Sequence, residues 1–371
     1  MAKLQTLEQT LQNHWRDSVS GEIRPPGYCR IMVVGVGGAG NNTVTRLMET
    51  GVVGAECVAI NTDALHLNVS KAHKKILIGK NLTKGLGVGG NPKLGRAAIE
   101  ESRKQIEDLF TGVDIAFITA GLGGGTGTGA APVVAEIARR KGAVTVGVVT
   151  TPFRIEKGRI EYAALALTEM RRYCDTVVVI DNNKLLRLVP HLPINEAFRV
   201  GDQVLVNMIK GISETISAPS LINLDFADFK TIVKRGGVAI VGVGESDAPN
   251  RAEEAVRNAL RSPLLDVDYM GAKGALIHVS GDEQMTIEEA NRVGEIVTEM
   301  MDDDALVIWG ARVNPELNGS LKVTLVMTGV NSPHLLSGFG AIAPQLFNLE
   351  PYAEPEKPLN IKLNLYQLEN F

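Results

Sequence analysis

The run at residues 123–129, Gly-Gly-Gly-Thr-Gly-Thr-Gly, constrains this chain more than any other stretch. It lies between an apolar, strand-like segment at 114–120 and a helix-like segment at 130–138. Glycine permits positive φ, so backbone N–H groups can converge on one point, and the helix that follows adds the positive end of its dipole. With two threonine hydroxyls as further donors, the run predicts an anion cradle, and the anion we expect is a polyphosphate. A flexible linker is the alternative, but a linker is not expected between a buried strand and a helix.

The order of apolar segments predicts an α/β fold with two domains. A chain of 371 residues exceeds what one core supports, roughly 250–300 residues. Strands without polar alternation, joined by helices, are typical of a mainly parallel, doubly wound sheet covered on both faces. We expect them at 30–34, 57–60, 76–78, 114–120, 144–149 and 176–180, with a single helix from 92 to about 109. A long helix is expected at 195–218, and strands of a smaller α/β domain at 238–243, 274–279, 305–309 and 322–327.

The N-terminal 29 residues differ from the body of the chain. An apolar stripe at helical spacing is formed by Leu4, Leu7, Leu11, Trp15 and Val19, and Pro25-Pro26 ends the pattern. We expect this amphipathic helix to pack on the body, with docking to a partner as the alternative. The tail from 331 has prolines and little periodicity, so we expect loose packing there.

Charge and cysteine content exclude several classes of protein. The net charge is −4, with 38 basic and 42 acidic residues and no basic block, which argues against nucleic acid as the main partner. Cys29, Cys57 and Cys174 are isolated, without disulfide or metal-site spacing, so a reducing cytoplasm is expected. No apolar run approaches the roughly 18 residues of a membrane span, so we expect no direct membrane insertion.

A second glycine loop precedes the first in the chain. Gly35-x-Gly37-x-x-Gly40, between a strand and a helix, fits the dinucleotide fingerprint, although the acid expected to end the second strand comes late, in Asn61-Thr-Asp63. Because both glycine loops follow strands of one sheet, they should converge on one ligand, and a further loop at 85–91 favours a nucleoside triphosphate. The pattern G-x-x-x-x-G-K-[ST] is absent, which excludes an ordinary P-loop protein. An NAD(P)-dependent oxidoreductase is the alternative.

At these motifs the chain resembles the FtsZ family, the tubulin-like GTPases of prokaryotic cell division. The 123–129 run matches the signature GGGTG[ST]G, and 35–42, 61–63, 121–129 and 223–228 follow the family's order. The likeness covers about residues 30–330, and the short tail is more similar to archaeal than to bacterial members. It implies an N-terminal extension (1–29), a GTP-binding domain (30–194), a central connecting helix (195–222), a C-terminal activation domain (223–330) and a tail (331–371).

The resemblance also implies function and partners. It implies an assembly-dependent GTPase that polymerises head to tail with copies of itself into filaments of the cytoplasmic division ring, near the membrane. The cofactors implied are GTP or GDP, with Mg²⁺ bound mainly through the nucleotide. Membrane-anchoring division proteins would dock on residues 1–29 or on the tail.

The resemblance carries residue roles onto the glycine loops and their neighbours. The implied phosphate contacts are Gly37, Gly38, Ala39, Gly40, Asn41, Gly123, Gly124, Gly125, Thr126, Gly127, Thr128 and Gly129, with Gly87, Gly89 and Gly90 near the γ-phosphate. Asn61 and Asp63 complete this edge. The implied base and ribose contacts are Asn42 at the guanine, Glu156 and Arg159 at the ribose, and Asn182 at the nucleoside.

Phe198 and Asp202 are four residues apart on the long helix and therefore share a face. Phe198 can stack on a base, and Asp202 can accept hydrogen bonds from the guanine N1–H and amine, a pair of donors that adenine lacks at that edge. The alternative is that Phe198 is ordinary core and Asp202 a solvated charge.

Two positions depart from the family pattern. Glu156-Lys-Gly-Arg159 is one residue shorter than the usual E-G-x-x-R, so either Arg159 shifts by one or Lys157 shares its role. Leu65 stands where the family often has Gln, near the γ-phosphate and its metal. The metal contact is then lost or supplied elsewhere, and a nucleotide-binding filament with little hydrolysis becomes an alternative function.

Asp225 and Asp228 are the predicted catalytic carboxylates. They precede a helix-like segment at 229–233, where the alternative is an N-cap and a first-turn acid. A helix of roughly 20 residues separates them by about 30 Å from the base-binding Phe198. Asp225 therefore cannot reach its own nucleotide but could reach that of the next molecule in a head-to-tail stack, a contact that generates a filament. There the pair would polarise the attacking water.

Overall fold

The computed structural model describes residues 29–52, 54–183, 191–217, 221–222, 226–234, 238–260 and 272–330. Its larger layer is a six-stranded sheet with the order β3-β2-β1-β4-β5-β6, all pairs parallel. The strands are β1 (Ile31–Val36), β2 (Ala55–Asn61), β3 (Lys74–Leu77), β4 (Ile115–Gly121), β5 (Val144–Thr151) and β6 (Thr176–Asp181). The predicted doubly wound parallel sheet is thereby confirmed.

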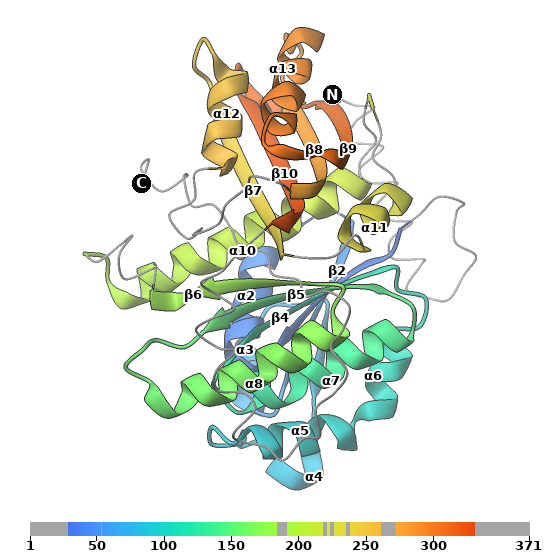
Figure 1. The fold of residues 1–371 in the computed structure, drawn as a ribbon. Helices are drawn as coiled ribbons and strands as arrows, with labels where there is room; N and C mark the ends of the chain where they lie inside the picture. The colour runs from blue at the N-terminus through green and yellow to red at the C-terminus, as the bar shows by residue number, and fades with distance from the viewer. Residues whose placement is uncertain are drawn as a thin grey trace, which may run out of the picture.

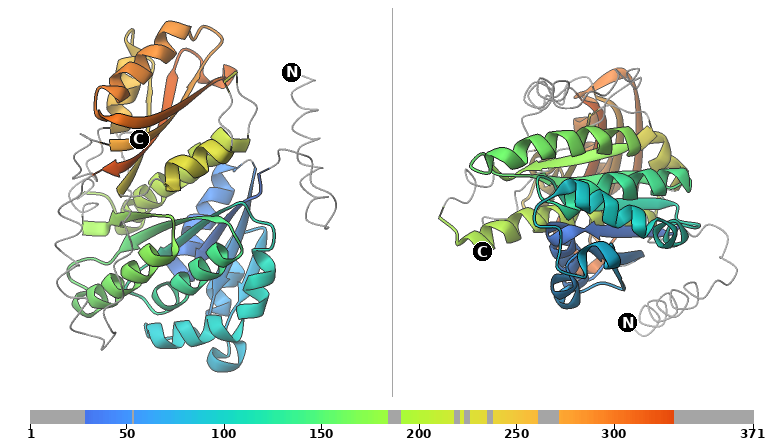
Figure 2. Two further views of the ribbon diagram at one scale, coloured as in Figure 1. Left: turned by 45° about the vertical axis from the view of Figure 1, so that its right-hand side comes forward. Right: turned by 90° about the horizontal axis from the view of Figure 1, so that it is seen from below.

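Helices cover both faces of this sheet (Figures 1 and 2). On one face the core contains residues of α2 (Gly37–Thr50) and α10 (Ile194–Ser217). On the other it contains residues of α5 (Pro92–Glu101), α6 (Arg103–Leu109), α7 (Thr126–Arg140) and α8 (Lys157–Tyr173). Two short helices, α3 (Ala64–Val69) and α4 (Lys80–Thr83), connect β2 to α5 around β3.

The single helix predicted from 92 to about 109 is wrong, because the chain breaks at Ser102 between α5 and α6. Ser102 has φ −102° and ψ 9°, and its N–H donates to Ile99 O, three residues back, at 3.0 Å. This tighter turn reorients the chain while Ile99 and Ile106 both stay fully buried. Local periodicity continues across the break, so the sequence pattern could not reveal it.

The second domain is a four-stranded sheet with the order β7-β10-β8-β9. Its strands are β7 (Val238–Ser246), β8 (Ala272–Gly281), β9 (Met301–Val313) and β10 (Leu321–Val330). β10 is antiparallel to β7 and β8, and β8 is parallel to β9. One face packs on α12 (Arg251–Leu260) and α13 (Ile287–Thr298), and a short 3₁₀ helix, Pro315–Leu317, lies between β9 and β10. The predicted smaller α/β domain and its four strands are confirmed.

The long helix α10 lies between the two sheets (Figure 1). Its Val206, Ile209 and Ile212 are buried in one core cluster with residues of both sheets and of α11 (Phe226–Lys234). The predicted long helix at 195–218 is confirmed within one residue at each end. α11 begins three residues before the predicted helical segment at 229. The domain boundaries themselves stay a prediction, and 1–28 and 331–371 lie outside the described residues.

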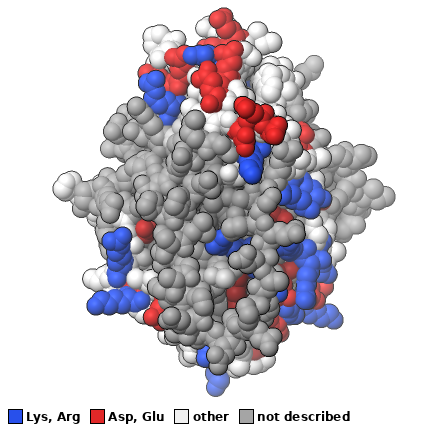
Figure 3. Space-filling view, in the orientation of Figure 1, with Lys and Arg blue, Asp and Glu red and all other residues white. Residues whose placement is uncertain are grey.

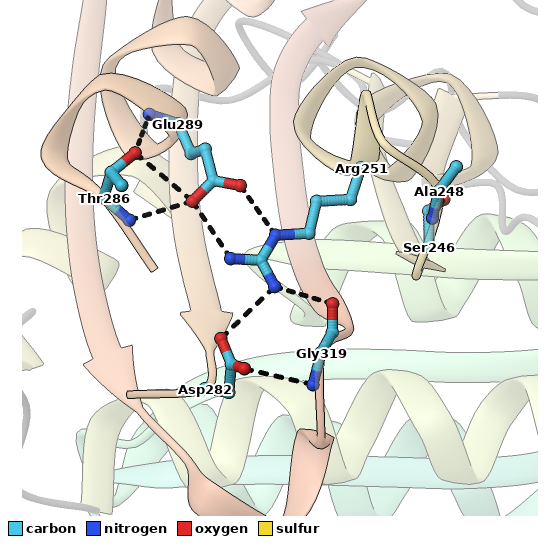
Figure 4. Close-up of polar contacts among 7 residues, drawn as sticks. All are labelled: Ser246, Ala248, Arg251, Asp282, Thr286, Glu289 and Gly319. Carbon is cyan, nitrogen blue, oxygen red and sulfur yellow. Dashed lines mark hydrogen bonds and ion pairs between the residues drawn. The ribbon is translucent and has the colours of Figure 1, made fainter. Parts of the chain in front are cut away.

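An arginine cluster ties the second domain together (Figure 4). Arg251 on α12 donates through Nε to Glu289 Oε1 at 2.6 Å and through Nη1 to Asp282 Oδ1 at 3.2 Å and Gly319 O at 2.6 Å. Glu289 also closes a capping box with Thr286 at the start of α13. We call Arg251, Asp282 and Glu289 the Arg251 cluster; it joins α12, α13 and the turns after β8 and before β10.

Acidic side chains gather over the second domain at the top of the face in Figure 3, and basic ones are scattered below. Among the residues that the structure describes, no helix combines the length and apolar character needed to cross a membrane.

Candidate nucleotide site

The N-termini of α2 and α7 lie side by side, at the point where β1 and β4 end. These neighbouring strands form the switch point of the strand order, where ligands bind in doubly wound sheets. α2 begins at Gly37, whose φ is +74°, and a Cβ there would lie 2.8 Å from the backbone N of Gly127. A Cβ on Gly121 would lie 2.7 Å from the Cβ of Ala39. The predicted convergence of the two glycine loops is therefore confirmed.

The loop at 85–91 packs against the same edge. A Cβ on Gly125, the residue before α7, would lie 2.4 Å from Val88 Cγ2. Gly87, Gly89 and Gly90 have φ of +80°, +56° and +79°. No atom lies near a Cβ built on Gly89 or Gly90, so their backbone conformation, rather than crowding, requires glycine. Three glycine-bearing loops thus line one edge of the sheet.

The two threonines of the central loop bind protein groups. Thr128 Oγ1 accepts the N–H of Gly123 at 2.8 Å, and Thr126 Oγ1 lies 2.7 Å from Thr62 Oγ1 at the end of β2. Both threonines are buried. These bonds hold the loop in its turn and to the neighbouring strand. Their contact with a phosphate stays a prediction.

Gly129 is required by helix packing. A Cβ there would lie 2.1 Å from Pro92 O, where α7 crosses α5, and its N–H already donates to Gly125 O at 3.0 Å. The last glycine of the run therefore has a structural cause independent of any ligand. Because the N–H of Gly129 already donates to Gly125 O, it is not free to donate to a phosphate, and the predicted phosphate contact of Gly129 stays a prediction.

The two asparagines of α2 differ in environment. Asn42 is exposed, whereas Asn41 is fully buried. Within the described part of the chain, neither Nδ2 nor Oδ1 of Asn41 has a hydrogen-bond partner. An unpaired buried polar group costs about 1–3 kcal/mol, so a ligand that satisfied this amide would be favoured here.

The predicted base-reading pair, Phe198 and Asp202, lies near the start of α10. The Phe198 ring is 41% exposed, with its centroid 5.8 Å from that of Phe153. The Asp202 side chain is only 17% exposed; its Oδ1 accepts from Thr43 Oγ1 at 3.1 Å and its Oδ2 from Arg46 Nη2 at 3.0 Å. The alternative of a core phenylalanine and a solvated aspartate is therefore wrong on both counts.

Burial raises the pKa of Asp202 above its ordinary value, and the charge and hydrogen bonds of Arg46 and the Thr43 hydroxyl oppose that shift. Thr43 and Arg46 were missed from the sequence. Thr43 and Arg46 are three residues apart and therefore share a face of α2, and this spacing is the signal that the sequence offers. Their partner Asp202 is more than 150 positions away in the sequence, so only the fold reveals the contact.

The predicted ribose residues lie beside the central glycine loop. Arg159 donates from Nη1 to Glu156 Oε1 at 2.7 Å, and Glu156 Oε2 accepts the N–H of Phe153 at 3.2 Å. A Cβ on Gly123 would lie 3.0 Å from Arg159 Cβ. In spite of the shortened spacing, Arg159 is therefore next to the loop; Arg159 and Lys157, the other candidate, are both exposed in the first turn of α8.

Asn182 is half-buried directly after β6. Its neighbour Asn183, which the sequence did not single out, donates from Nδ2 to Asp181 Oδ1 at 2.7 Å and accepts the N–H of Arg154 at 2.8 Å. Asn183 thus fixes the loop after β5 against the end of β6. The nucleoside contact of Asn182 stays a prediction.

Asn61 and Asp63 shape the turn from β2 into α3. Asn61 Oδ1 accepts the N–H of Thr62 at 2.9 Å, and Asp63 Oδ1 caps α3 by accepting the N–H of His66 at 3.0 Å. Leu65, two positions after Asp63, is 82% exposed. Two further apolar side chains near this turn are also exposed: Val69, at the end of α3, and Leu86, which forms a strand bridge with Asp63.

Of the predicted catalytic pair, Asp225 lies outside the described residues. Asp228 is half-buried in the first turn of α11, beyond the C-terminal end of α10 (Figure 1). Among the described residues no group of three His, Cys, Asp or Glu side chains could hold a metal ion.

Comparison with known proteins agrees with this geometry. The Tubulin/FtsZ family, GTPase domain, matches residues 30–190, and the FtsZ family, C-terminal domain, matches 237–331. Cell division protein FtsZ 2 of Methanocaldococcus jannaschii is 56% identical over 84% of this chain and 82% of its own length. Cell division protein FtsZ 1 of Pyrococcus furiosus is 52% identical over 91% of this chain and 89% of its own. An empty FtsZ dimer from M. jannaschii superposes with a TM-score of 0.77 at 47% identity, over 93% of this chain and 99% of that one.

Proposed function

The chain belongs to the Tubulin/FtsZ family, and from that premise we propose how its parts serve a GTPase that assembles into filaments. It binds GTP and GDP at the glycine-lined edge of the six-stranded sheet and hydrolyses GTP to GDP and phosphate. Copies join head to tail into the filaments of the cell division ring. Because the chain belongs to this family, the alternative of an NAD(P)-dependent oxidoreductase is wrong, and the Gly35–Gly40 turn is part of a GTPase domain.

One observation carries the head-to-tail arrangement: Phe198 and Asp202 lie near the start of α10, whereas Asp228 lies on α11, the helix beyond the other end of α10 (Figure 1 labels both helices). From Phe198 to Ser217 the helix rises about 28 Å, at 1.5 Å per residue. Asp228 follows that far end, so it is placed to complete the site of a neighbouring molecule. Such a heterologous contact repeats and builds a filament.

Each interface then contains one active site. One subunit supplies backbone N–H groups of the glycine loops and the N-termini of α2 and α7, which stabilise negative charge on the phosphates. The next subunit inserts Asp225 and Asp228, which accept hydrogen bonds from the attacking water and orient it toward the γ-phosphate. Turnover therefore requires assembly.

The start of α10 selects guanine. Phe198 stacks on the base, and Asp202 accepts hydrogen bonds from its N1–H and amine. Arg46 at 3.0 Å favours the ionised carboxylate that this role needs, against the effect of burial. Glu156 and Arg159, already paired beside the central loop, contact the ribose side.

When bound with the nucleotide, Mg²⁺ would supply positive charge at the phosphate oxygens. Asp63 supplies a carboxylate at that edge; its Cβ would lie 3.8 Å from a Cβ on Gly87. Oxygen donors of this kind, together with phosphates and water, suit Mg²⁺. The fit supports a metal held mainly by the nucleotide.

Two segments outside the described residues, 1–28 and 331–371, are the proposed docking sites for a membrane-anchoring division protein. That partner would hold the filaments, which lie in the cytoplasm, at the division ring near the membrane. Nucleic acid is not proposed as a partner, since the net charge is −4 and the sequence contains no basic block.

A mixing experiment tests the shared active site. Asp225→Ala should bind GTP but not supply the water-orienting carboxylate, and Asp202→Ala should lose guanine affinity but keep Asp225 and Asp228. Each variant alone should release little phosphate, and an equimolar mixture should recover part of the wild-type rate, because some interfaces combine an intact nucleotide site with intact carboxylates. A mixture no more active than its components would contradict the proposal.

The exposed Leu65 favours a second candidate, a GTP-binding filament with little hydrolysis. Phosphate release measured against protein concentration separates the two. A threshold concentration followed by a rise supports assembly-coupled hydrolysis, whereas filaments visible by light scattering without phosphate release support the scaffold.

A further inference from the structure

We propose that His66 donates a hydrogen bond from Nε2 to a phosphate oxygen of the bound nucleotide. This inference rests on the proposed function, and it adds a phosphate-binding side chain at the edge where Leu65 replaces the family's polar residue. Neither the glycine pattern nor the family resemblance indicated His66.

Three hydrogen bonds hold the backbone of His66. Its N–H donates to Asp63 Oδ1 at 3.0 Å, and its carbonyl oxygen accepts from Ser70 N at 3.2 Å and from Ser70 Oγ at 2.8 Å. The short helix α3 is thereby fixed at this residue, and the half-buried imidazole starts from a defined position.

Asn61 decides which ring nitrogen carries the proton. Asn61 Oδ1 accepts two backbone N–H groups, from Thr62 at 2.9 Å and from Asp63 at 3.3 Å. These donors fix the amide, so its NH₂ group is the one facing His66 Nδ1, at 3.5 Å. An amide nitrogen only donates, so Nδ1 must accept, and the neutral ring then has its proton on Nε2.

Nε2 points at the first glycine loop. It is the nearest atom, at 3.7 Å, to a Cβ built on Gly38, and the ring carbon Cδ2 follows at 4.0 Å. Gly38 lies in the first turn of α2, where backbone N–H groups point toward the predicted phosphates. A side-chain N–H is thus added to the backbone donors of the same cradle.

The tautomer also limits what His66 can do. With Nε2 protonated, that nitrogen has no lone pair for a metal or for the proton of the attacking water. His66 therefore does not replace the metal contact absent at Leu65. It contributes affinity for phosphate.

Two substitutions separate the two ring positions. His66→Gln places an amide NH₂ near the site of Nε2, whereas His66→Asn reaches only the position of Nδ1. We expect Asn to weaken GDP binding about tenfold to a hundredfold, the usual effect of losing a hydrogen bond to a charged group, and Gln to restore most of it. Guanosine, which has no phosphate, should bind both variants and the wild type alike. Comparing losses for GDP and GTP identifies which phosphate is contacted.

A spectroscopic readout tests the geometry directly. In ¹⁵N-labelled protein, the His66 Nε2 resonance should be of the protonated type and shift on GDP but not on guanosine binding. Equal GDP affinity for His66→Asn and wild type, or a protonated Nδ1, would overturn the inference and leave the proposed function intact. Wild-type protein that binds no GDP would instead contradict the proposed function.

Discussion

Two regions of the molecule differ in whether their polar groups have hydrogen-bond partners: the Arg251 cluster of the second domain and the edge of the six-stranded sheet. In the cluster, Arg251 is paired with two carboxylates and a carbonyl, and Glu289 also closes a cap. At the sheet edge, Asn41 is buried without a hydrogen-bond partner among the described residues, and Phe198 is 41% exposed. Satisfied polar groups stabilise the fold, whereas groups left without a partner are available to a ligand. Substitutions should therefore affect stability in one region and nucleotide affinity in the other.

The largest expected effect on stability is at Arg251. Arg251→Met leaves Glu289 and Asp282 without their cation and should lower the free energy of unfolding by about 3 kcal/mol. Arg292→Met is the matched control, since Arg292 on α13 pairs with Glu253 on α12 at 2.9 Å but is 46% exposed; its effect on the free energy of unfolding should be much smaller. Chemical denaturation measures both, and GDP affinity should not change. Equal losses for the two variants would contradict the contrast.

The pH dependence of stability should have opposite signs at Glu289 and Asp202. The hydrogen bond from Arg251 is the largest cause that lowers the pKa of Glu289, so its contribution is present above about pH 4.3 and is lost as pH falls through the lowered value. Burial raises the pKa of Asp202, so its contribution is present below about pH 3.9 and is lost as pH rises through the raised value.

Denaturation of Glu289→Gln and Asp202→Asn across pH 3.5–7.5 measures this difference. For Glu289→Gln at neutral pH, we expect the free energy of unfolding to fall by about 1.5–3 kcal/mol, the usual contribution of a hydrogen bond to a charged group. Asp202→Asn should leave the nucleotide-free protein as stable or more stable at pH 7. Guanine nucleotide affinity should fall as the wild type is acidified through the pKa of Asp202, because protonation removes acceptors. Matching pH profiles for the two variants would argue against this assignment.

Asn41 tests the sheet edge alone. Asn41→Leu removes an unpaired buried amide and should raise the free energy of unfolding of the nucleotide-free protein by about 1 kcal/mol, while GDP affinity falls about tenfold or more. Thermal unfolding with and without GDP reports both quantities. A destabilised nucleotide-free protein would show that Asn41 serves the fold rather than the ligand.

The smallest expected effect on stability is at Leu65. Because this side chain is 82% exposed, Leu65→Gln should change stability by less than about 0.5 kcal/mol. If the polar residue common in the family assists the metal, phosphate release above the assembly threshold should rise. Unchanged release would show that this position does not limit hydrolysis.

Much of the fold could be predicted because its signals are local. Apolar strands, glycine turns and the periodicity of α10 each lie within a few residues, and the strand order then brings the loops together. The break at Ser102 was missed because Ile99 and Ile106 keep one apolar face across it.

The candidate site was predicted less completely, because its side chains depend on distant partners. Arg46 was missed since its partner Asp202 lies on another helix, and His66 since its tautomer depends on how Asn61 is held. The hydrogen bond that Thr128 Oγ1 accepts from the N–H of Gly123 was also missed, because only the folded turn defines it.

The placement of α10 has a mechanical consequence. Val206, Ile209 and Ile212 lie in a core that includes residues of both sheets, so packed side chains connect the two sheets through this helix. In a filament under tension, the packed core of every subunit would therefore carry the force, and each subunit would extend little before it unfolds. Force generated at one interface would pass along the polymer as through a stiff rod.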